Sequence, residues 1–98
     1  MAYEKDPTPG TRGWRVDQLR QTLGVKRKDM AVMLEAIARA LRITGVGEWT
    51  PSRVTNVILE RKPLSLDEAA AIVALATEQG LDVFTWDWLV HVDQDARD

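Results

Sequence analysis

Four side chains that can form hydrogen bonds lie close together in the stretch TPSRVTNVILE, which begins at Thr50. They are Ser52, Arg53, Thr55 and Asn56. Between them, apolar residues recur at helical spacing and predict one buried stripe, formed by Val54, Val57 and Ile58. We therefore expect the polar side chains on the opposite side of a helix over about residues 51–60. Their hydroxyl, guanidinium and amide groups suit hydrogen bonds to base edges and phosphates.

Two successive helices must position this polar face, and both have clear start signals. Thr50 is a preferred N-cap, and Pro51 fits the first helical position because an N–H there has no intrahelical partner. The second helix opens with the capping box Ser65-x-x-Glu68, and Gly80 ends it. Its predicted apolar stripe comprises Leu66, Ala69, Ala70, Ile72, Val73, Leu75 and Ala76.

The run RVTNVI from Arg53, followed by RKPLSLDEA from Arg61, resembles the recognition helix and the next helix of the XRE/Cro-like helix-turn-helix family. Most members of that family are phage and bacterial transcriptional regulators. The resemblance covers about 30 residues without a gap, and the family often has glycine where this chain has Glu60. It implies an all-α, lambda-repressor-like domain of about five helices that binds double-stranded DNA.

Carried over position by position, the resemblance places Pro51, Ser52 and Asn56 toward the bases, with Asn56 as the best adenine reader. Arg53 can reach a guanine or a phosphate, and Thr55 completes the predicted base-contacting set. The predicted phosphate contacts are Lys26, Arg27, Lys28, Thr50, Arg61 and Lys62.

Two further helices are predicted upstream. Residues 14–24 form the first, and residues 26–43 form a long second helix in which Glu35 and Arg39 are spaced as an i,i+4 ion pair. If Ala31 is the family's small residue in this helix, the stretch before Val54 is roughly 13 residues longer than usual. If Ala40 is that residue, the turn is about four residues longer. Residues 1–13, with two prolines and two glycines, are predicted to be a flexible arm.

The segment 83–92 is consistent with two structures. Phe84, Trp86, Trp88 and Val90 alternate as on one face of a strand, which would form a dimerising edge. The same residues fit a fifth helix with Thr85 as N-cap. Under either interpretation we predict that these four residues form a homodimer or partner interface, unless they cap the domain's own core. The helix-turn-helix domain then spans residues 14–92, and residues 93–98 form an acidic tail.

Charge is distributed unevenly along the 98 residues, although the net charge is only −2. Residues 7–62 contain eleven basic and five acidic side chains, a net of +6. Residues 63–98 contain one basic and eight acidic side chains, a net of −7. Such a chain can present a positive face to phosphates and turn an acidic side away, although charges also segregate by chance in short chains.

The chain offers little for catalysis or metal binding, because it has no cysteine and one histidine, His91. We therefore predict no enzyme, no cofactor and no metal site. The longest wholly apolar run is residues 69–76, far shorter than a membrane span, so we expect a cytoplasmic protein with no membrane partner.

Two functions remain from different classes. The first is a sequence-specific DNA-binding regulator, a homodimeric repressor of phage or mobile-element type. The alternative is a protein-interaction module on the same scaffold, such as an antitoxin or an inhibitor of a host factor, using the acidic, tryptophan-bearing C-terminal part.

Overall fold

The computed structural model describes residues 6–43, 47–81, 84–85 and 88–89, and these residues form helices and no strand. The all-α prediction is confirmed. The helices, in chain order, are α1 (Arg12–Leu23), α2 (Arg27–Ala40), α3 (Pro51–Ile58) and α4 (Leu66–Glu78). The described residues thus give four helices instead of the predicted five or so. None of these four is long and apolar enough to cross a membrane.

The predicted fifth element, residues 83–92, lies mostly outside the described residues. Within the described part, Trp88 and Leu89 are helical. The Trp88 N–H donates to the Thr85 hydroxyl at 3.3 Å, and the Leu89 N–H donates to the Thr85 carbonyl at 3.0 Å. Thr85 therefore acts as the N-cap that the sequence predicted for the helical alternative.

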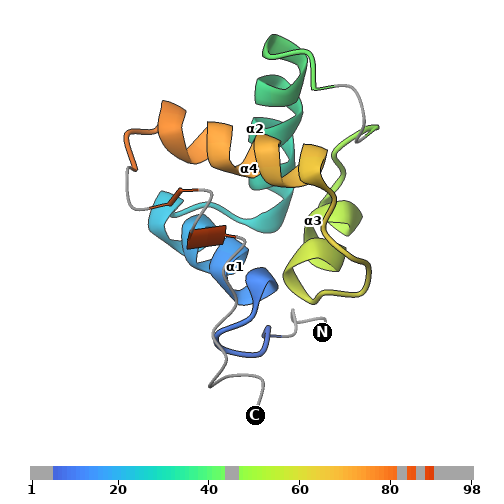
Figure 1. Ribbon diagram of the computed structural model, residues 1–98, viewed down its shortest axis with the longest axis vertical. Helices are drawn as coiled ribbons and strands as arrows, with labels where there is room; N and C mark the ends of the chain where they lie inside the picture. The colour runs from blue at the N-terminus through green and yellow to red at the C-terminus, as the bar shows by residue number, and fades with distance from the viewer. Residues whose placement is uncertain (1–5, 44–46, 82–83, 86–87, 90–98) are drawn as a thin grey trace.

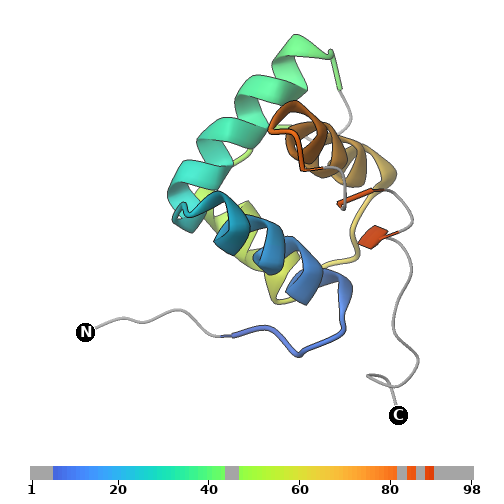
Figure 2. The same ribbon diagram turned by 90° about the vertical axis from the view of Figure 1, so that its left-hand side faces the viewer.

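The two helices nearest the polar face are held by different neighbours. α3 contacts both α1 and α2, and α4 contacts α2. In Figure 1, α4 crosses α2, and α1 and α3 lie together below α4; Figure 2 shows the same packing turned by 90°. All four helices contribute to one apolar core, whose largest fully buried side chains are Leu19, Met30, Leu34, Ile58, Ile72 and Leu89.

Side-chain caps start three of the helices. Thr11 accepts from the Trp14 N–H, Thr50 from the Arg53 N–H, and Ser65 from the Glu68 N–H. The caps predicted at Thr50 and Ser65 are confirmed, including the reciprocal bond of the capping box. α1 begins at Arg12, two residues earlier than predicted, because Thr11 supplies a cap that the sequence analysis did not use. Residues 12 and 13 therefore belong to the helix and not to the predicted arm.

All four helices end in the same way, with a residue in the left-handed region and a backbone N–H that reaches back across the last turn. The four bonds run from Val25 N to Arg20 O, Ile43 N to Ala38 O, Arg61 N to Asn56 O and Leu81 N to Ala76 O. Glycine fills the left-handed position after α1 and α4, as Gly24 and Gly80. After α2 and α3 the position holds Arg42 (φ 56°) and Glu60 (φ 54°). This turn ends α2 at Ala40, earlier than the predicted helix end at residue 43.

The predicted stripe of α4 is correct at its centre and wrong at its start. Ile72 and Leu75 are buried, but Leu66 is 77% exposed. Ala71, which the stripe omitted, is fully buried. The buried residues of α4 are Ala69, Ala71, Ile72, Leu75 and Ala76, so Leu66, the first residue of the helix, lies outside the buried face.

Gly13 marks the closest approach of α1 to α3. A Cβ added at this residue would overlap the carbonyl group of Ile58 and would stand 2.9 Å from the Val57 carbonyl oxygen. Both obstacles are backbone atoms, so no side-chain rotation can relieve the overlap. Glycine at this position allows the start of α1 to pack against the end of α3.

Gly13→Ala should therefore lower the free energy of unfolding by about 2 kcal/mol or more. In an unobstructed helix the same change would raise stability by about 1 kcal/mol. Urea unfolding measures the difference, and Gly24→Ala is the control because its Cβ would meet nothing and only the left-handed backbone would be strained. A Gly13→Ala variant as stable as the wild type would contradict this packing.

Glu60→Gly should raise the free energy of unfolding by about 0.5–1 kcal/mol, because a left-handed backbone is strained for residues with a Cβ. Glu60→Ala is the matched control, since it removes the same carboxylate but keeps the Cβ. Thermal unfolding at one pH should rank glycine above alanine. The opposite order would contradict the proposed strain, because the two variants differ only in the Cβ.

Candidate functional site

The polar face predicted for α3 is present at the surface. Val54, Val57 and Ile58 are buried in the core, as their spacing predicted. Pro51 and Ser52 are exposed, and Thr55 and Asn56 are half-buried. The short helix therefore presents a hydroxyl, an amide and a proline ring outward from a rigid apolar base.

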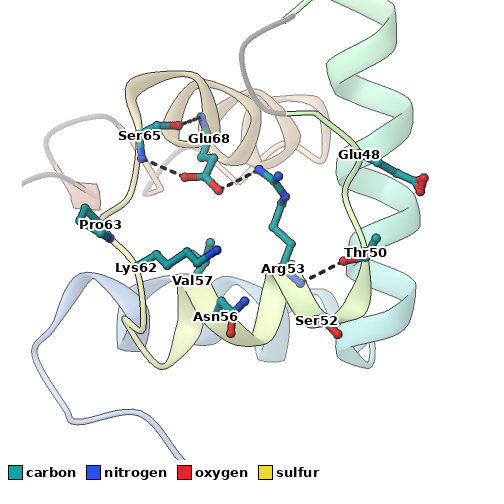
Figure 3. Close-up of a pocket in the computed structure, with 10 residues that line it drawn as sticks. All are labelled: Glu48, Thr50, Ser52, Arg53, Asn56, Val57, Lys62, Pro63, Ser65 and Glu68. Carbon is teal, nitrogen blue, oxygen red and sulfur yellow. Dashed lines mark hydrogen bonds and ion pairs between the residues drawn. The ribbon is translucent and has the colours of Figure 1, made fainter.

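Arg53 does not share this outward direction. Its Nη1 lies 3.2 Å from Oε2 of Glu68 on α4, and its guanidinium carbon lies 5.7 Å from the centre of the Trp49 ring. Figure 3 shows the side chain extending from α3 toward Glu68. The predicted base reader is thus held by an acid and an aromatic ring.

An open groove separates α3 from the start of α4 (Figure 3), with a volume of about 610 Å³. Its walls carry two basic groups, Arg53 and Lys62, and two acidic groups, Glu48 and Glu68. The remaining lining residues are Thr50, Ser52, Asn56, Val57, Pro63 and Ser65. Five of the predicted contact residues, Thr50, Ser52, Arg53, Asn56 and Lys62, thus line one surface feature.

The N-terminus of α2 lies against the middle of α3. Arg27 Nη1 is 3.4 Å from the Thr55 hydroxyl oxygen, and Arg27 is only 4% exposed. Arg27 was a predicted phosphate contact, but its burial makes it a link between α2 and α3 instead. Its neighbours Lys26 and Lys28 are exposed and remain available to a ligand beside α3.

The turn after α3 brings a second group of basic residues to the other end of that helix. Arg61 and Lys62 are exposed. Lys62 and Arg12, from the first turn of α1, line the same small cavity of about 60 Å³. Glu60 also lines it, so one acid lies among these bases. Basic side chains from three separate segments therefore border α3.

Thr50 uses its hydroxyl oxygen as the cap of α3, accepting from the Arg53 N–H at 3.1 Å. A hydroxyl can accept and donate together, so capping leaves its O–H for a phosphate oxygen.

The connection that leads into α3 is fixed by a contact that the sequence analysis missed. Glu35 Oε1 accepts the backbone N–H of Trp49 at 2.9 Å, and the Trp49 side chain is 4% exposed. Arg39 Nε lies 2.6 Å from Glu35 Oε2, which confirms the predicted i,i+4 pair. In the sequence, the only sign of this contact is the tryptophan directly before the N-cap Thr50. Hydrophobic periodicity gives no information about Trp49, because this residue lies outside a helix.

The C-terminal aromatics differ from the predicted interface. Phe84 is 8% exposed and belongs to the core, and Trp88 is half-buried with its ring 4.5 Å from Phe84 in an edge-to-face contact. Arg15 Nη1 donates to the Trp88 carbonyl at 2.7 Å. These two rings cap the domain's own core, the alternative left open above. Trp86 and Val90 lie outside the described residues.

The residues that the structure describes contain no group of three or more histidine, cysteine, aspartate or glutamate side chains that could hold a metal ion. His91 lies outside them. Comparisons with protein-family models, with curated proteins and with solved structures found no match to this chain.

The hydrogen bond from the Trp49 N–H and the bond from Arg39 together lower the pKa of Glu35. Both stabilise the carboxylate, as does the charge of Arg39, and they outweigh the effect of desolvation. Because the folded-state pKa is depressed, the stability contributed by Glu35 is present above the pKa of an unfolded glutamate. It is lost as the pH falls through the lower, folded-state value.

Glu35→Gln should keep an acceptor for the Trp49 N–H but remove this titration. The wild type should therefore be more stable than the variant at pH 7, and the difference should shrink as the pH falls below about 4.3. Chemical unfolding at a series of pH values measures it. A difference that stays constant down to pH 3 would contradict the depressed pKa.

Proposed function

We propose that this chain binds double-stranded DNA in a sequence-specific manner, with α3 in the major groove, and regulates transcription. The observation that carries the proposal is the arrangement around α3. The exposed polar face of α3 has exposed basic residues near it in two segments: Lys26 and Lys28 flank Arg27, which contacts Thr55, and Arg61 and Lys62 follow the helix. Basic side chains at the rim of such a face orient a protein on the DNA phosphates, and the polar side chains between them contact the edges of the DNA bases.

The dimensions of α3 support the same assignment. An α-helix with its side chains is about 10–12 Å across, which fits the width of the major groove, and the eight residues of α3 give about 12 Å of helix to lie in it. Ser52 and Asn56 are one helical turn apart and lie on the exposed side. Asn56 is the side chain in this set that can pair with adenine through two hydrogen bonds. The resemblance of residues 53–69 to XRE/Cro-like regulators also supports α3 as the helix that contacts the DNA bases.

The alternative, a protein-interaction module, receives less support from the described residues. Its proposed surface included Phe84 and Trp88, which pack on the core. Truncating the chain after residue 82 would remove the proposed partner surface together with the buried Leu89. Because this would damage the fold, the truncation would not separate the two functions.

Selection from a random duplex DNA pool tests the proposal. The expected result is an enriched motif, palindromic if the homodimer forms, and an affinity that falls with salt between about 50 and 200 mM. Salt-sensitive binding that enriches no motif would indicate that the protein binds phosphates through its basic surface but does not recognise a DNA sequence. Folded protein that binds no duplex would overturn the proposal and favour a protein partner.

Two variants then separate base reading from phosphate contact. Asn56→Ala should weaken binding to the selected motif by roughly 1–3 kcal/mol and relax specificity at one base pair, because a base-edge contact is lost. Arg61→Ala should weaken all sequences alike. Arg42→Ala removes an equal charge from an exposed position just after the far end of α2 and should change binding little. Unchanged binding by Asn56→Ala would refute the assigned recognition face.

A further inference from the structure

Arg53 is a predicted base reader whose side chain is directed into the groove between α3 and α4. Arg53 crosses the groove to Glu68, and its side chain is 33% exposed. The Glu68 side chain is 13% exposed, so the carboxylate is largely removed from water. A guanidinium that is paired with a carboxylate cannot offer the same N–H groups to DNA.

We propose that Glu68 competes with DNA phosphates for Arg53, and so withholds this arginine from arbitrary DNA. The inference rests on the proposed function and identifies the ligand of the groove as a phosphodiester oxygen. Arginine pairs with carboxylate and with phosphate through the same N–H groups, so the Nη1 that Glu68 holds must leave it before it can bind a phosphate.

Two contacts keep Glu68 in position independently of Arg53. Its Oε1 accepts the Ser65 N–H at 2.9 Å, and its own N–H donates to the Ser65 hydroxyl at 3.1 Å. The capping box therefore fixes the carboxylate at the start of α4, where only Oε2 faces Arg53 (Figure 3). Arg53 is the movable partner of the pair.

Withholding Arg53 lowers the affinity of the protein for arbitrary DNA. Each additional phosphate contact raises affinity for every sequence alike and steepens the salt dependence. While Glu68 retains Arg53, that contribution is absent from the complex with arbitrary DNA. Glu68 is therefore a positioning residue, which acts on DNA through Arg53.

Glu68→Gln tests this directly, because glutamine also serves in a capping box but carries no charge. We expect the variant to bind a random-sequence duplex roughly tenfold more tightly at about 50 mM salt, with a salt slope steeper by about 0.9. Asp67→Asn is the matched control, since it removes one exposed negative charge from the same helical turn. It should change the slope little.

Arg53→Gln supplies the second readout. If Glu68 acts through Arg53, adding Glu68→Gln to Arg53→Gln should produce no further gain in DNA affinity. Without DNA, each single substitution should raise the unfolding equilibrium constant roughly two- to fivefold. The double variant should raise it by less than the product of the two single effects.

The outcomes separate this inference from the proposed function. Wild-type binding with no difference between Glu68→Gln and Asp67→Asn would overturn the inference alone. So would an affinity gain that persists without Arg53, or additive effects on unfolding. Absence of DNA binding by the wild type and by every variant would overturn both.

Discussion

The placement of α3 depends on how the chain enters it at Trp49. A helix of eight residues is too short to be stable by itself, so its position must come from tertiary contacts. The ring of Trp49 is buried, its backbone N–H is bound by Glu35 of α2, and Thr50 caps α3 directly afterwards. Together these contacts fix the start of α3, and the close approach of Gly13 to Ile58 packs the end of α3 against α1.

The polar contacts around α3 form one chain through the molecule. It runs from Arg39 and Glu35 on α2 to Trp49, then to Arg53 on α3, and through Glu68 to Ser65 at the start of α4. Each exposed link contributes little stability, as surface ion pairs generally do. Their joint effect is geometric, because they fix three elements around one groove and decide which side chains face outward. These contacts therefore determine which polar and basic groups are exposed around α3.

Local signals in the sequence predicted local structure well. The caps at Thr50 and Ser65 and the buried stripe of α3 follow from short-range chemistry, and the structure confirms them. Other features depend on contacts between residues that are 14 to 28 positions apart in the sequence. They are the bond from Arg27 to Thr55, the bond from Trp49 to Glu35 and the pairing of Arg53 with Glu68. Periodicity carries no information about such pairs. The early end of α2 was missed for another reason, since a left-handed turn at Arg42 lacks the glycine that usually signals it.

The most direct measurement of the central claim is an NMR titration of the folded protein with a random-sequence DNA duplex at low salt. The account predicts that backbone amides at the N-terminus of α2, along the outer face of α3 and in the turn at Arg61 and Lys62 shift together. Amides of the second half of α4 should stay unchanged. Shifts concentrated on α4, or none at all, would contradict the assignment of α3 and its basic border as the DNA-binding surface.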